Sequence, residues 1–534
     1  MPGAYGERQV EPCFLKSLTG PLLNPWDRLR RDANLNSGNE FRSPEYKRTP
    51  SRFRNPIGKY RLHRSSDCIA CGKCVEICPY GVHIVRRGQV FVKNHYLCVG
   101  SDCPEPCYEA CPVQALSVRR NPDFDVMGDF RWTPDLLVST WHMAEFGEVP
   151  PKGLECKIGG SEGGFDKLRL IFKDVKSGHE LSLGGSDEEV DVGVDLNRRH
   201  DNAHRIRIDV PFYGGGMSYG SVSITTMLSR IKAAAALGTF CCTGEGGYPD
   251  ELKPYDDHVI TQVATGLFGV SEETIRRVKI VEFKYAQGAK PGLGGHLLGD
   301  KVTPGVARMR EAVVGYPLFS PFPFHSVYSV EDHKKHVDWI KAINPQALVS
   351  VKVSTPTDVD MVAVGSYYAG AHIIHLDGSY GGTGAAPDIA KKNIAMPIEY
   401  AIPKVHRFLQ EEGVRDKITV IASGGIRTPH DVAKIIALGA DGVCTGTADL
   451  VALECIRCHN CESGRGCARG IATTDQELMD LIDLEWGTQR IINMFLAWRN
   501  ELVRILRRLG MKSLKELVGR TDCLVHLDYM ERSA

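Results

Sequence analysis

Residues 419–447 read TVIASGGIRTPHDVAKIIALGADGVCTGT, and this stretch indicates how most of the chain folds. It holds two short apolar runs, at 419–422 and 442–445, and each run ends in a glycine-containing turn. Between them, residues 429–438 have the apolar spacing of an amphipathic helix. A strand, a helix and a second strand in this order predict a parallel unit, because parallel strands need a long crossover connection.

The same alternation extends outward on both sides of this unit. Eight strands are expected, at 206–211, 239–243, 280–285, 317–320, 348–353, 372–376, 419–422 and 442–445. Helices are expected between several of them, at 223–237, 302–313, 357–369, 395–412 and 429–438. Eight strands with intervening helices predict an α/β fold of the (β/α)8 TIM barrel type, in which active sites lie at the carboxyl ends of the strands.

Two glycine turns follow the last two expected strands. They supply the candidate cofactor-binding residues Gly424, Gly425, Gly446 and Thr447. In barrels, the loops after strands seven and eight often bind a phosphate group through backbone N–H groups. The alternative is that both are tight strand-to-helix turns that bind no ligand.

Eight cysteines lie ahead of the barrel in two groups that each end in Cys-Pro. In the bacterial ferredoxin arrangement, three close cysteines bind one cluster and the fourth binds its neighbour. We therefore predict two 4Fe–4S clusters, one on Cys68, Cys71, Cys74 and Cys111, the other on Cys98, Cys103, Cys107 and Cys78. Zinc sites or disulfides are the alternatives, but the spacing fits zinc poorly and no secretory signal indicates an oxidising compartment.

A third cysteine group follows the barrel and consists of Cys455, Cys458, Cys461 and Cys467. It starts shortly after the turn at Gly446, so the chain keeps it near the expected phosphate site. We predict a third iron–sulfur cluster here, and a zinc site that includes His459 is the alternative. Clusters beside a phosphate-binding barrel favour flavin mononucleotide (FMN), because a flavin accepts single electrons and delivers a hydride.

Composition limits the possible partners. The chain has 65 Lys and Arg against 65 Asp and Glu, so its charge favours neither nucleic acid nor an acidic membrane. No apolar run is long enough for a membrane span, and with no secretory signal we expect a cytoplasmic protein. A nicotinamide-binding Gly-x-Gly-x-x-Gly motif between a strand and a helix is also missing, so NAD(P)H would have to act through a partner.

We expect five segments along the chain. They are an extended arm (1–60), a ferredoxin-like α+β module (61–120), a connecting segment (121–205), the barrel with its cysteine loop (206–475) and C-terminal helices (476–534). Within the connecting segment, residues 184–189 are expected to form a surface loop. The C-terminal segment has Leu, Ile and Met at helical spacing and is expected to pack against the barrel.

From about residue 210 to 524, the sequence resembles the FMN-binding synthase domain of the glutamate synthase family. The resemblance rests on GMSYGS at 216–221, TGEGG at 243–247, QGAKPG at 287–292, VSVK at 349–352, GGTGA at 381–385 and GIAT at 470–473. The fused cysteine module ahead of this region is similar to that of the short, archaeal-type glutamate synthases.

The resemblance implies FMN in the barrel and an iron–sulfur centre beside it. By motif position, FMN would contact Met217, Ser218, Tyr219 and Lys352 in addition to the glycine turns. Family members usually hold a 3Fe–4S centre on three cysteines. The additional thiol of Cys458 favours a 4Fe–4S centre in this chain.

The resemblance also implies a reaction. In the family, ammonia released from glutamine condenses with 2-oxoglutarate, and reduced FMN delivers a hydride to the imine. Gln287, Lys290 and Arg310 would bind the dicarboxylate, and Glu245 would handle the proton of the imine. For Lys290 and Arg310, the alternative is a charge that is solvated on a loop or helix.

Two motifs depart from the family pattern. The usual Gly-Glu-Gly-Gly-Gln reads GLGGH at 292–296, and the usual Pro-His-His-Asp reads PFHS at 323–326. Leu293 cannot accept a hydrogen bond, so a less polar pocket is expected. Three functions stay open: a synthase that acts on 2-oxoglutarate or a related 2-oxo acid, an enzyme similar to N-methylglutamate synthase that uses another amine, and an electron-transfer subunit whose flavin only relays electrons.

The family pattern also indicates partners. The chain starts Met1-Pro2-Gly3, without the N-terminal cysteine nucleophile of an amidotransferase, and it lacks the glycine-repeat β-helix domain. We therefore expect separate glutaminase and β-helix subunits. The electron donor would be ferredoxin or an NAD(P)H-oxidising subunit.

Overall fold

The computed structural model describes residues 43–530, apart from 152, 162, 173–189, 321–323, 383, 385, 387, 388, 392, 463 and 464. The expected arm at 1–60 therefore lies mostly outside the described residues, and the expected surface loop at 184–189 lies outside them entirely. Within the described residues, no helix combines the length and the apolar character that crossing a membrane requires.

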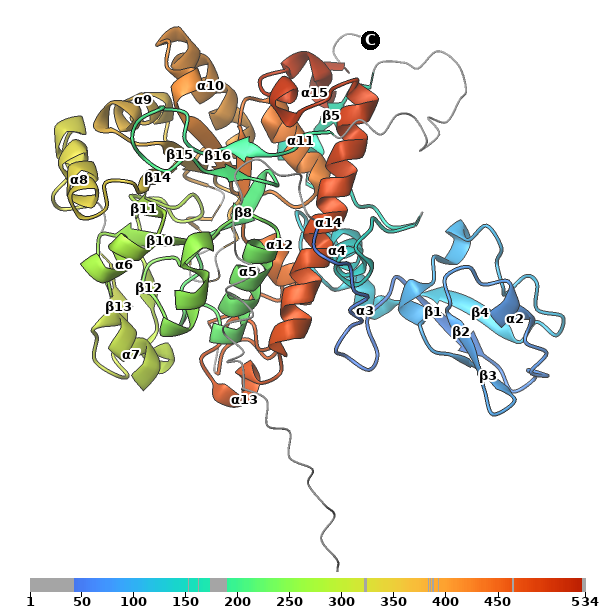
Figure 1. Ribbon diagram of the computed structural model, residues 1–534. Coiled ribbons are helices and arrows are strands. Elements are labelled where there is room, and N and C mark those ends of the chain that lie inside the picture. Colours follow the sequence, from blue (N-terminus) through green and yellow to red (C-terminus); the bar gives the residue numbers. More distant parts are fainter. Residues whose placement is uncertain are drawn as a thin grey trace, which may run out of the picture. The chain divides into compact units, whose positions relative to one another are not determined.

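Eight parallel strands close into a barrel (Figure 1). In chain order they are β8 (Phe212–Gly214), β9 (Cys241–Cys242), β10 (Val259–Ala264), β11 (Ile280–Lys284), β14 (Leu348–Ser354), β15 (Ile373–Asp377), β16 (Thr419–Ser423) and β17 (Gly442–Thr445). The ring closes where Val443 of β17 pairs with Phe212 of β8. The predicted (β/α)8 barrel is thereby confirmed.

Helices connect these strands and cover the barrel. They are α5 (Ile224–Ala236), α6 (Glu272–Arg277), α7 (Pro304–Arg310), α8 (Val330–Ile343), α9 (Val359–Ala369), α10 (Ile398–Glu411), α11 (Pro429–Ala437) and α12 (Thr447–Ala452). Several begin at a Ser or Thr whose side chain accepts a backbone N–H of the first turn, as Ser223 does from Thr226 and Thr428 does from Asp431.

The prediction of the first barrel strand at 206–211 was wrong. Within that range, β7 (Arg207–Ile208) pairs with β6 (Val194–Asp195) in a small antiparallel sheet. The barrel strand begins only after Pro211, which has no N–H to contribute to a sheet.

The prediction of a barrel strand at 317–320 was also wrong. This range contains β13 (Leu318–Phe319), which forms an antiparallel pair with β12 (His296–Leu297) outside the barrel, and Phe319 is 68% exposed. The strand that takes its place in the barrel is β10, which carries Thr261 and Gln262 at its centre and so lacks a continuous apolar signal. Two predicted strands are therefore replaced in the barrel by β8 and β10, and the two glycine turns still follow strands seven and eight.

Residues ahead of the barrel form the ferredoxin-like module and a connecting helix. In the module, β1 (Tyr60–Arg64) pairs with β4 (Leu116–Arg120), β2 (His83–Arg86) pairs with β3 (Gln89–Val92), and α2 (Lys73–Glu76) carries a cysteine. Then follow α3 (Pro122–Asp125), α4 (Pro134–Phe146) and β5 (Leu168–Leu170), which pairs with β18 (Leu524–His526). The remaining helices are α13 (Gln476–Met479), α14 (Leu484–Leu509) and α15 (Leu527–Met530).

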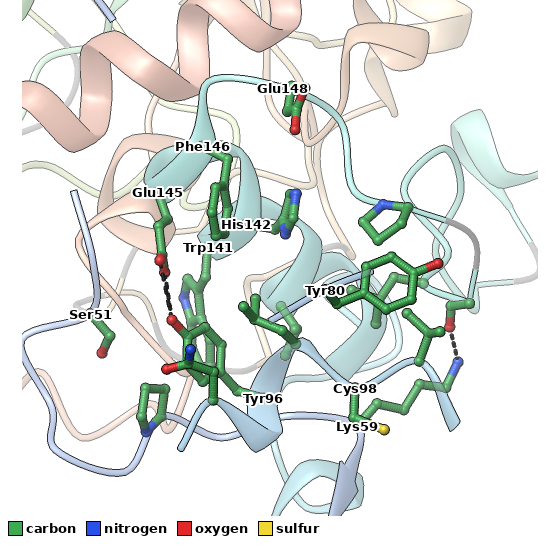
Figure 2. Close-up of a pocket in the computed structure, with 18 of the residues that line it drawn as sticks. Ser51, Lys59, Tyr80, Tyr96, Cys98, Trp141, His142, Glu145, Phe146 and Glu148 are labelled. Atoms are coloured by element: carbon green, nitrogen blue, oxygen red, sulfur yellow. Dashed lines mark hydrogen bonds between the residues drawn. The ribbon is translucent and has the colours of Figure 1, made fainter. Parts of the chain in front are cut away.

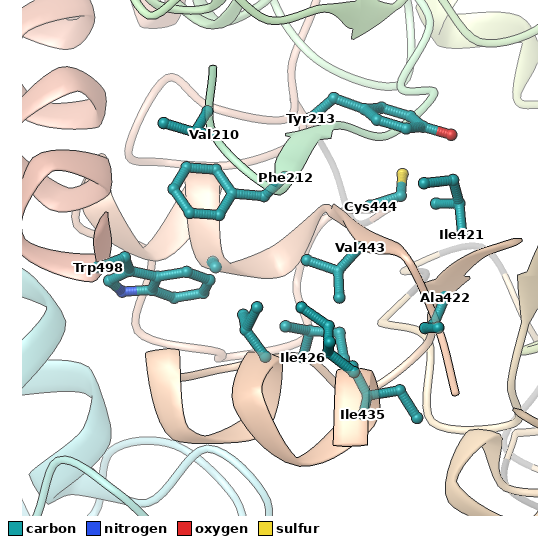
Figure 3. Packing of buried hydrophobic residues seen from close by; sticks show 14 of the residues in the cluster. Val210, Phe212, Tyr213, Ile421, Ala422, Ile426, Ile435, Val443, Cys444 and Trp498 are labelled. Atoms are coloured by element: carbon teal, nitrogen blue, oxygen red, sulfur yellow. The ribbon is translucent and has the colours of Figure 1, made fainter. Parts of the chain in front are cut away.

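Aromatic side chains of the long helix α14 pack against Phe212 of β8, and Figure 3 shows Trp498 beside Phe212. The ring of Phe212 on β8 stacks on Phe495 at 4.6 Å between centroids, and Trp498 meets Phe212 edge-on at 5.9 Å. Trp498 is fully buried, so this part of α14 belongs to the same core as the barrel. Aromatic pairs in these geometries stabilise a core beyond the area that they bury.

Candidate active site and metal centres

The eight cysteines of the module gather around two small cavities. One cavity is lined by Cys68, Cys71, Cys74 and Cys111, and the other by Cys78, Cys98, Cys103 and Cys107. These are the two quartets that the ferredoxin spacing predicts, with the fourth cysteine of each run placed at the other cavity.

Polar side chains support the thiols of the module. Arg64 donates to Cys68 Sγ at 3.0 Å and to Cys74 Sγ at 3.3 Å, and His83 Nε2 lies 3.2 Å from Cys107 Sγ. Burial, with smaller contributions from the neighbouring Cys98 and Cys78, raises the pKa of Cys107 to about 12. Thiolates in such a place need positive charge, which the iron of a cluster would supply and the Arg64 guanidinium would complement.

The third cysteine group lies in the loop after α12. Burial raises the pKa of Cys455 to about 11, with smaller contributions from the thiols of Cys461 and Cys467, and the Arg457 N–H donates to Cys455 Sγ at 3.4 Å. The thiols of Cys461 and Cys467 therefore act electrostatically on Cys455, and Cys458, which is exposed, acts on Cys461.

A cavity of about 520 Å³ is lined by residues of the module, of α4 and of α14. Its lining includes Cys98 of the second quartet and Glu454, the residue before Cys455. Figure 2 shows Tyr80, Tyr96 and Trp141 around it, and the Tyr96 hydroxyl donates to Glu145 at 3.1 Å. One cysteine of the second quartet and the residue that precedes the third cysteine group therefore line the same aromatic-lined cavity.

At the carboxyl ends of the barrel strands, Arg310 of α7 reaches the loop after β8. Its Nη2 atom donates to Ser218 Oγ at 2.9 Å and to the Tyr219 carbonyl at 3.0 Å. Gly246 has φ +126, and a Cβ there would lie 2.6 Å from the Arg310 guanidinium carbon, so only glycine fits. Arg310 is 5% exposed, which excludes the alternative of a solvated helix charge.

Lys290 is the second buried cation at this mouth and is also 5% exposed. Burial and the nearby Lys284 lower its pKa to about 8, although Glu245 opposes the shift. Burial likewise lowers the pKa of Arg310 to about 10. Among the described residues, neither Lys290 nor Arg310 has a carboxylate within ion-pair distance, whereas Glu245 lies 3.6 Å from Lys284. Two buried cations without a counter-ion suit an anionic ligand.

The loop after β15 lies close to the loop of Lys290, to the turn after β17 and to the third cysteine loop. A Cβ at Gly381 would lie 3.4 Å from Ala289, the neighbour of Lys290. At Gly382, a Cβ would lie 2.4 Å from Thr447 Oγ1 and 3.1 Å from Arg457 Nη1. The candidate substrate loop, the turn after β17 and the third cysteine loop therefore converge.

A chain of buried polar side chains crosses the barrel interior beneath this mouth. Glu282 accepts from Gln262 at 2.7 Å and lies 3.0 Å from His375 Nδ1. His375 Nε2 is 2.8 Å from Ser423 Oγ, which donates to Asp377 Oδ1 at 2.6 Å. Ser423 therefore connects the His375 ring to the Asp377 carboxylate.

Asp377 joins this chain to two predicted site segments. Its Oδ2 atom accepts the Gly288 N–H at 3.0 Å, which fixes the loop of Gln287 and Lys290, and lies 3.5 Å from Lys352 Nζ. Burial would lower the pKa of Lys352, but Asp377 and Glu282 outweigh it and raise the pKa. For Glu282, burial is outweighed by His375 and Lys352, which hold its pKa at about 2.

The comparisons with known proteins agree with this geometry. Residues 173–512 match the model of the conserved region in glutamate synthase, and residues 63–82 match that of the 4Fe–4S binding domain. The chain belongs to the glutamate synthase family. The resemblance seen in the motifs is thereby confirmed, and family membership makes the chain an oxidoreductase of the type that acts on CH–NH2 donors.

Curated members of the glutamate synthase family cover most of the chain. The archaeal-type glutamate synthase (NADPH) of Thermotoga maritima is 37% identical over 477 residues, which are 86% of this chain and 92% of that protein. The archaeal glutamate synthase (NADPH) of Methanocaldococcus jannaschii is 37% identical over 87% of this chain and 94% of its own. Among solved structures, the flavin-binding domain of baker's yeast flavocytochrome b2 has a TM-score of 0.42 at 16% identity and covers 69% of this chain and 78% of that chain.

One of the two glycine turns, the one after β17, leaves room for the phosphate group that a flavin would bring. A Cβ at Gly446 would meet nothing within 4 Å, so the turn after β17 faces open space. The Ser379 hydroxyl, which follows β15, is buried and has no hydrogen-bond partner among the described residues. Open space and a free buried hydroxyl fit a polar ligand better than the alternative of empty tight turns.

Of the two motifs that depart from the family pattern, the first lies beside Lys290, whose carbonyl accepts the Leu293 N–H at 3.2 Å. Leu293 is 45% exposed, His296 stacks on Phe319 at 5.9 Å, and Ser326 Oγ lies 2.8 Å from His336 Nε2. Pro323 lies outside the described residues. The residues that sequence reasoning missed are Gln262, Glu282, His375, Asp377 and Ser423, because no local pattern marks side chains that meet only when the barrel closes.

Proposed function

We propose that this chain is the synthase subunit of a glutamate synthase. It reductively aminates 2-oxoglutarate or a related 2-oxo acid, with electrons supplied through iron–sulfur clusters. The observation that carries the proposal is the pair of buried cations, Lys290 and Arg310, that have no carboxylate partner among the described residues and lie at the barrel mouth.

FMN is the proposed cofactor of the barrel. It would be held by Met217, Ser218, Tyr219, Lys352, Gly424, Gly425, Gly446 and Thr447. A bound flavin would accept electrons singly and deliver a hydride to the imine carbon. The buried Lys352 cation would favour negative charge that develops nearby.

The substrate would be oriented by the loop and helix around the mouth. Lys290 and Arg310 would each bind a carboxylate, and Gln287, in the loop that Asp377 fixes, would assist. Glu245, at 3.6 Å from Lys284, would hold or release the proton of the imine nitrogen.

Three iron–sulfur clusters would deliver electrons to this site. Two 4Fe–4S clusters on the module quartets would pass them across the cavity lined by Cys98 and Glu454 to a third, 4Fe–4S or 3Fe–4S, cluster on the Cys455 group. The donor would be ferredoxin or an NAD(P)H-oxidising subunit, and separate glutaminase and β-helix subunits would complete a cytoplasmic enzyme.

A second candidate uses a different nitrogen source. Leu293 and His296 stand where the family usually has an acid and an amide, which favours an amine such as methylamine as in N-methylglutamate synthase. The two candidates separate when the reduced protein is mixed with 2-oxoglutarate and either ammonia or methylamine. Reoxidation by one of the two amines identifies the nitrogen source.

Replacement of Lys290 tests the substrate site itself. We expect Lys290→Ala to abolish turnover and leave the flavin content unchanged, because this lysine would bind substrate and not cofactor. Lys253→Ala is the control, since Lys253 is an exposed lysine paired with Asp250. Kinetics like those of the unmodified protein in Lys290→Ala would remove the assignment.

A further inference from the structure

Arg131 lies in the segment between α3 and α4, outside the region that matches the glutamate synthase model, and it is 5% exposed. Among the described residues, its Nη1 and Nη2 atoms have no hydrogen-bond partner. Its backbone is fixed, because its N–H donates to Asp129 Oδ1 at 2.8 Å and its carbonyl accepts from Arg427 at 2.9 Å. The guanidinium is thus held in a buried place with its terminal donors unused.

The guanidinium lies at the carboxyl end of the seventh barrel strand. A Cβ at Gly425, which follows β16 and has φ +112, would lie 3.1 Å from Arg131 Nη2 and 3.2 Å from Tyr380 Cβ. The guanidinium carbon lies 3.4 Å from the centre of the Tyr380 ring. The guanidinium thus lies over the Tyr380 ring, and its Nη2 atom lies beside the turn after β16 that is expected to contact a phosphate.

The carboxylates near Arg131 do not accept hydrogen bonds from its terminal nitrogens. Arg427 is bound by Asp166 at 2.7 Å and Asp431 at 2.9 Å, so those carboxylates are already occupied. Glu399 is the other acid near Arg131, but within the described part of the chain no ion pair joins them, and both Glu399 oxygens are also unpartnered. A buried guanidinium without an acceptor is unfavourable, so this place suits an anion.

A second arginine approaches the same end of the barrel. Arg457 is held by Asp129 at 3.1 Å, and its Nη1 atom lies near Gly382 and Thr447. The Asp129 carboxylate therefore accepts from the side chain of Arg457 and from the backbone N–H of Arg131. Residues 129–131 bring both cations to the turns after β16 and β17.

We propose that Arg131 binds the phosphate group of the flavin through its two terminal nitrogens. This inference rests on the proposed function, because it requires FMN in the barrel. It adds a cofactor-binding residue that comes from the connecting segment and not from the barrel. A planar guanidinium with two free N–H groups matches the paired oxygens of a phosphate.

The test compares FMN with riboflavin, which has the same ring and no phosphate. Both are titrated by flavin fluorescence against the full chain after the flavin is removed and the clusters are kept. We expect Arg131→Gln to weaken FMN binding about 10- to 100-fold, as for loss of hydrogen bonds to a charged group. Riboflavin binding should stay unchanged, and Arg131→Lys should keep part of the FMN affinity.

Each other outcome overturns the inference. Equal weakening of FMN and riboflavin would show that Arg131 only supports the fold, and unchanged FMN binding would show that it serves Glu399 through water. Glu399→Gln, expected to leave the ratio of the two affinities unchanged, controls for that case. If Arg131→Gln does not fold, Arg131→Lys decides the question by the same ratio. If the unmodified protein binds neither FMN nor riboflavin, the proposed function fails together with this inference. If it binds both flavins and the Arg131 variants bind them equally well, only this inference fails.

Discussion

The Nζ atom of Lys352 lies 3.5 Å from Oδ2 of Asp377, and both side chains are buried inside the barrel. Asp377 also fixes the loop of Lys290 through the Gly288 N–H, so one carboxylate contacts a proposed flavin residue and the proposed substrate loop. Through Ser423 and His375, the same carboxylate is connected to Glu282. The positions of the proposed flavin residue Lys352 and of the proposed substrate loop therefore depend on this network.

Removing Lys352 should destabilise the fold. Lys352→Met leaves Asp377 buried without its cation, for which we expect a loss of about 3–5 kcal/mol in the free energy of unfolding. The double variant Lys352→Met with Asp377→Asn should recover part of this loss, because no unpaired charge is left. Urea unfolding followed by tryptophan fluorescence measures both. A double variant less stable than Lys352→Met would contradict this coupling.

Substrate binding should depend on pH through Lys290. Burial lowers the pKa of Lys290 to about 8, so its side chain is a cation below that pH and neutral above it. We therefore expect kcat/KM for 2-oxoglutarate to fall as pH rises through about 8, since kcat/KM reports groups of the free enzyme. Lys290→Arg, which stays charged, should move the decline to higher pH. If kcat/KM falls over the same pH range in both proteins, the decline belongs to a group other than Lys290.

Arg64 should tune the cluster on the first quartet. Its guanidinium donates to Cys68 and Cys74, and positive charge beside a cluster favours the reduced form. We expect Arg64→Leu to lower the reduction potential of that cluster by about 50 mV, or roughly 1 kcal/mol for one electron. Potentiometric EPR measures the shift. Arg61→Leu, whose exposed guanidinium pairs with Asp123, should leave the potential unchanged; a similar shift in both would show a general charge effect.

Loss of a cysteine ligand in the ferredoxin-like module should stop electron transfer from ferredoxin but still allow direct reduction of the flavin. Cys71 is exposed, so Cys71→Ser removes a proposed ligand and little packing. We expect reduction by ferredoxin to stop and reduction of the flavin by dithionite to continue, because dithionite does not need the module. Equal loss of both reactions would contradict the proposed order of transfer.

Local sequence features were sufficient to predict the barrel class and the grouping of the module cysteines. The cysteine quartets follow from spacing alone, because the ferredoxin arrangement ties spacing to geometry, and the structure gathers Cys111 with Cys68 as that arrangement requires. The turns at Gly425 and Gly446 follow from position along the alternating strands and helices.

The features of the fold and site that the sequence did not reveal depend on contacts across the barrel. His375 and Glu282 come from β15 and β11 and meet only because the sheet closes. The burial of Arg310 depends on the packing of α7 against Gly246, which no helical pattern reveals. Strand β10 was not predicted because its central residue Gln262 is polar. Gln262 is buried because its side chain donates to Glu282 on the neighbouring strand β11.

The central claim is that electrons held by this chain reduce an imine at the barrel mouth. The most direct test is a single turnover, in which the fully reduced, purified protein is mixed rapidly with 2-oxoglutarate and ammonia while flavin absorbance and amino-acid product are followed. The account predicts flavin reoxidation that requires both reactants, with glutamate formed in proportion. A flavin that stays reduced with every 2-oxo acid and amine tried would contradict it, and would leave a chain that only relays electrons.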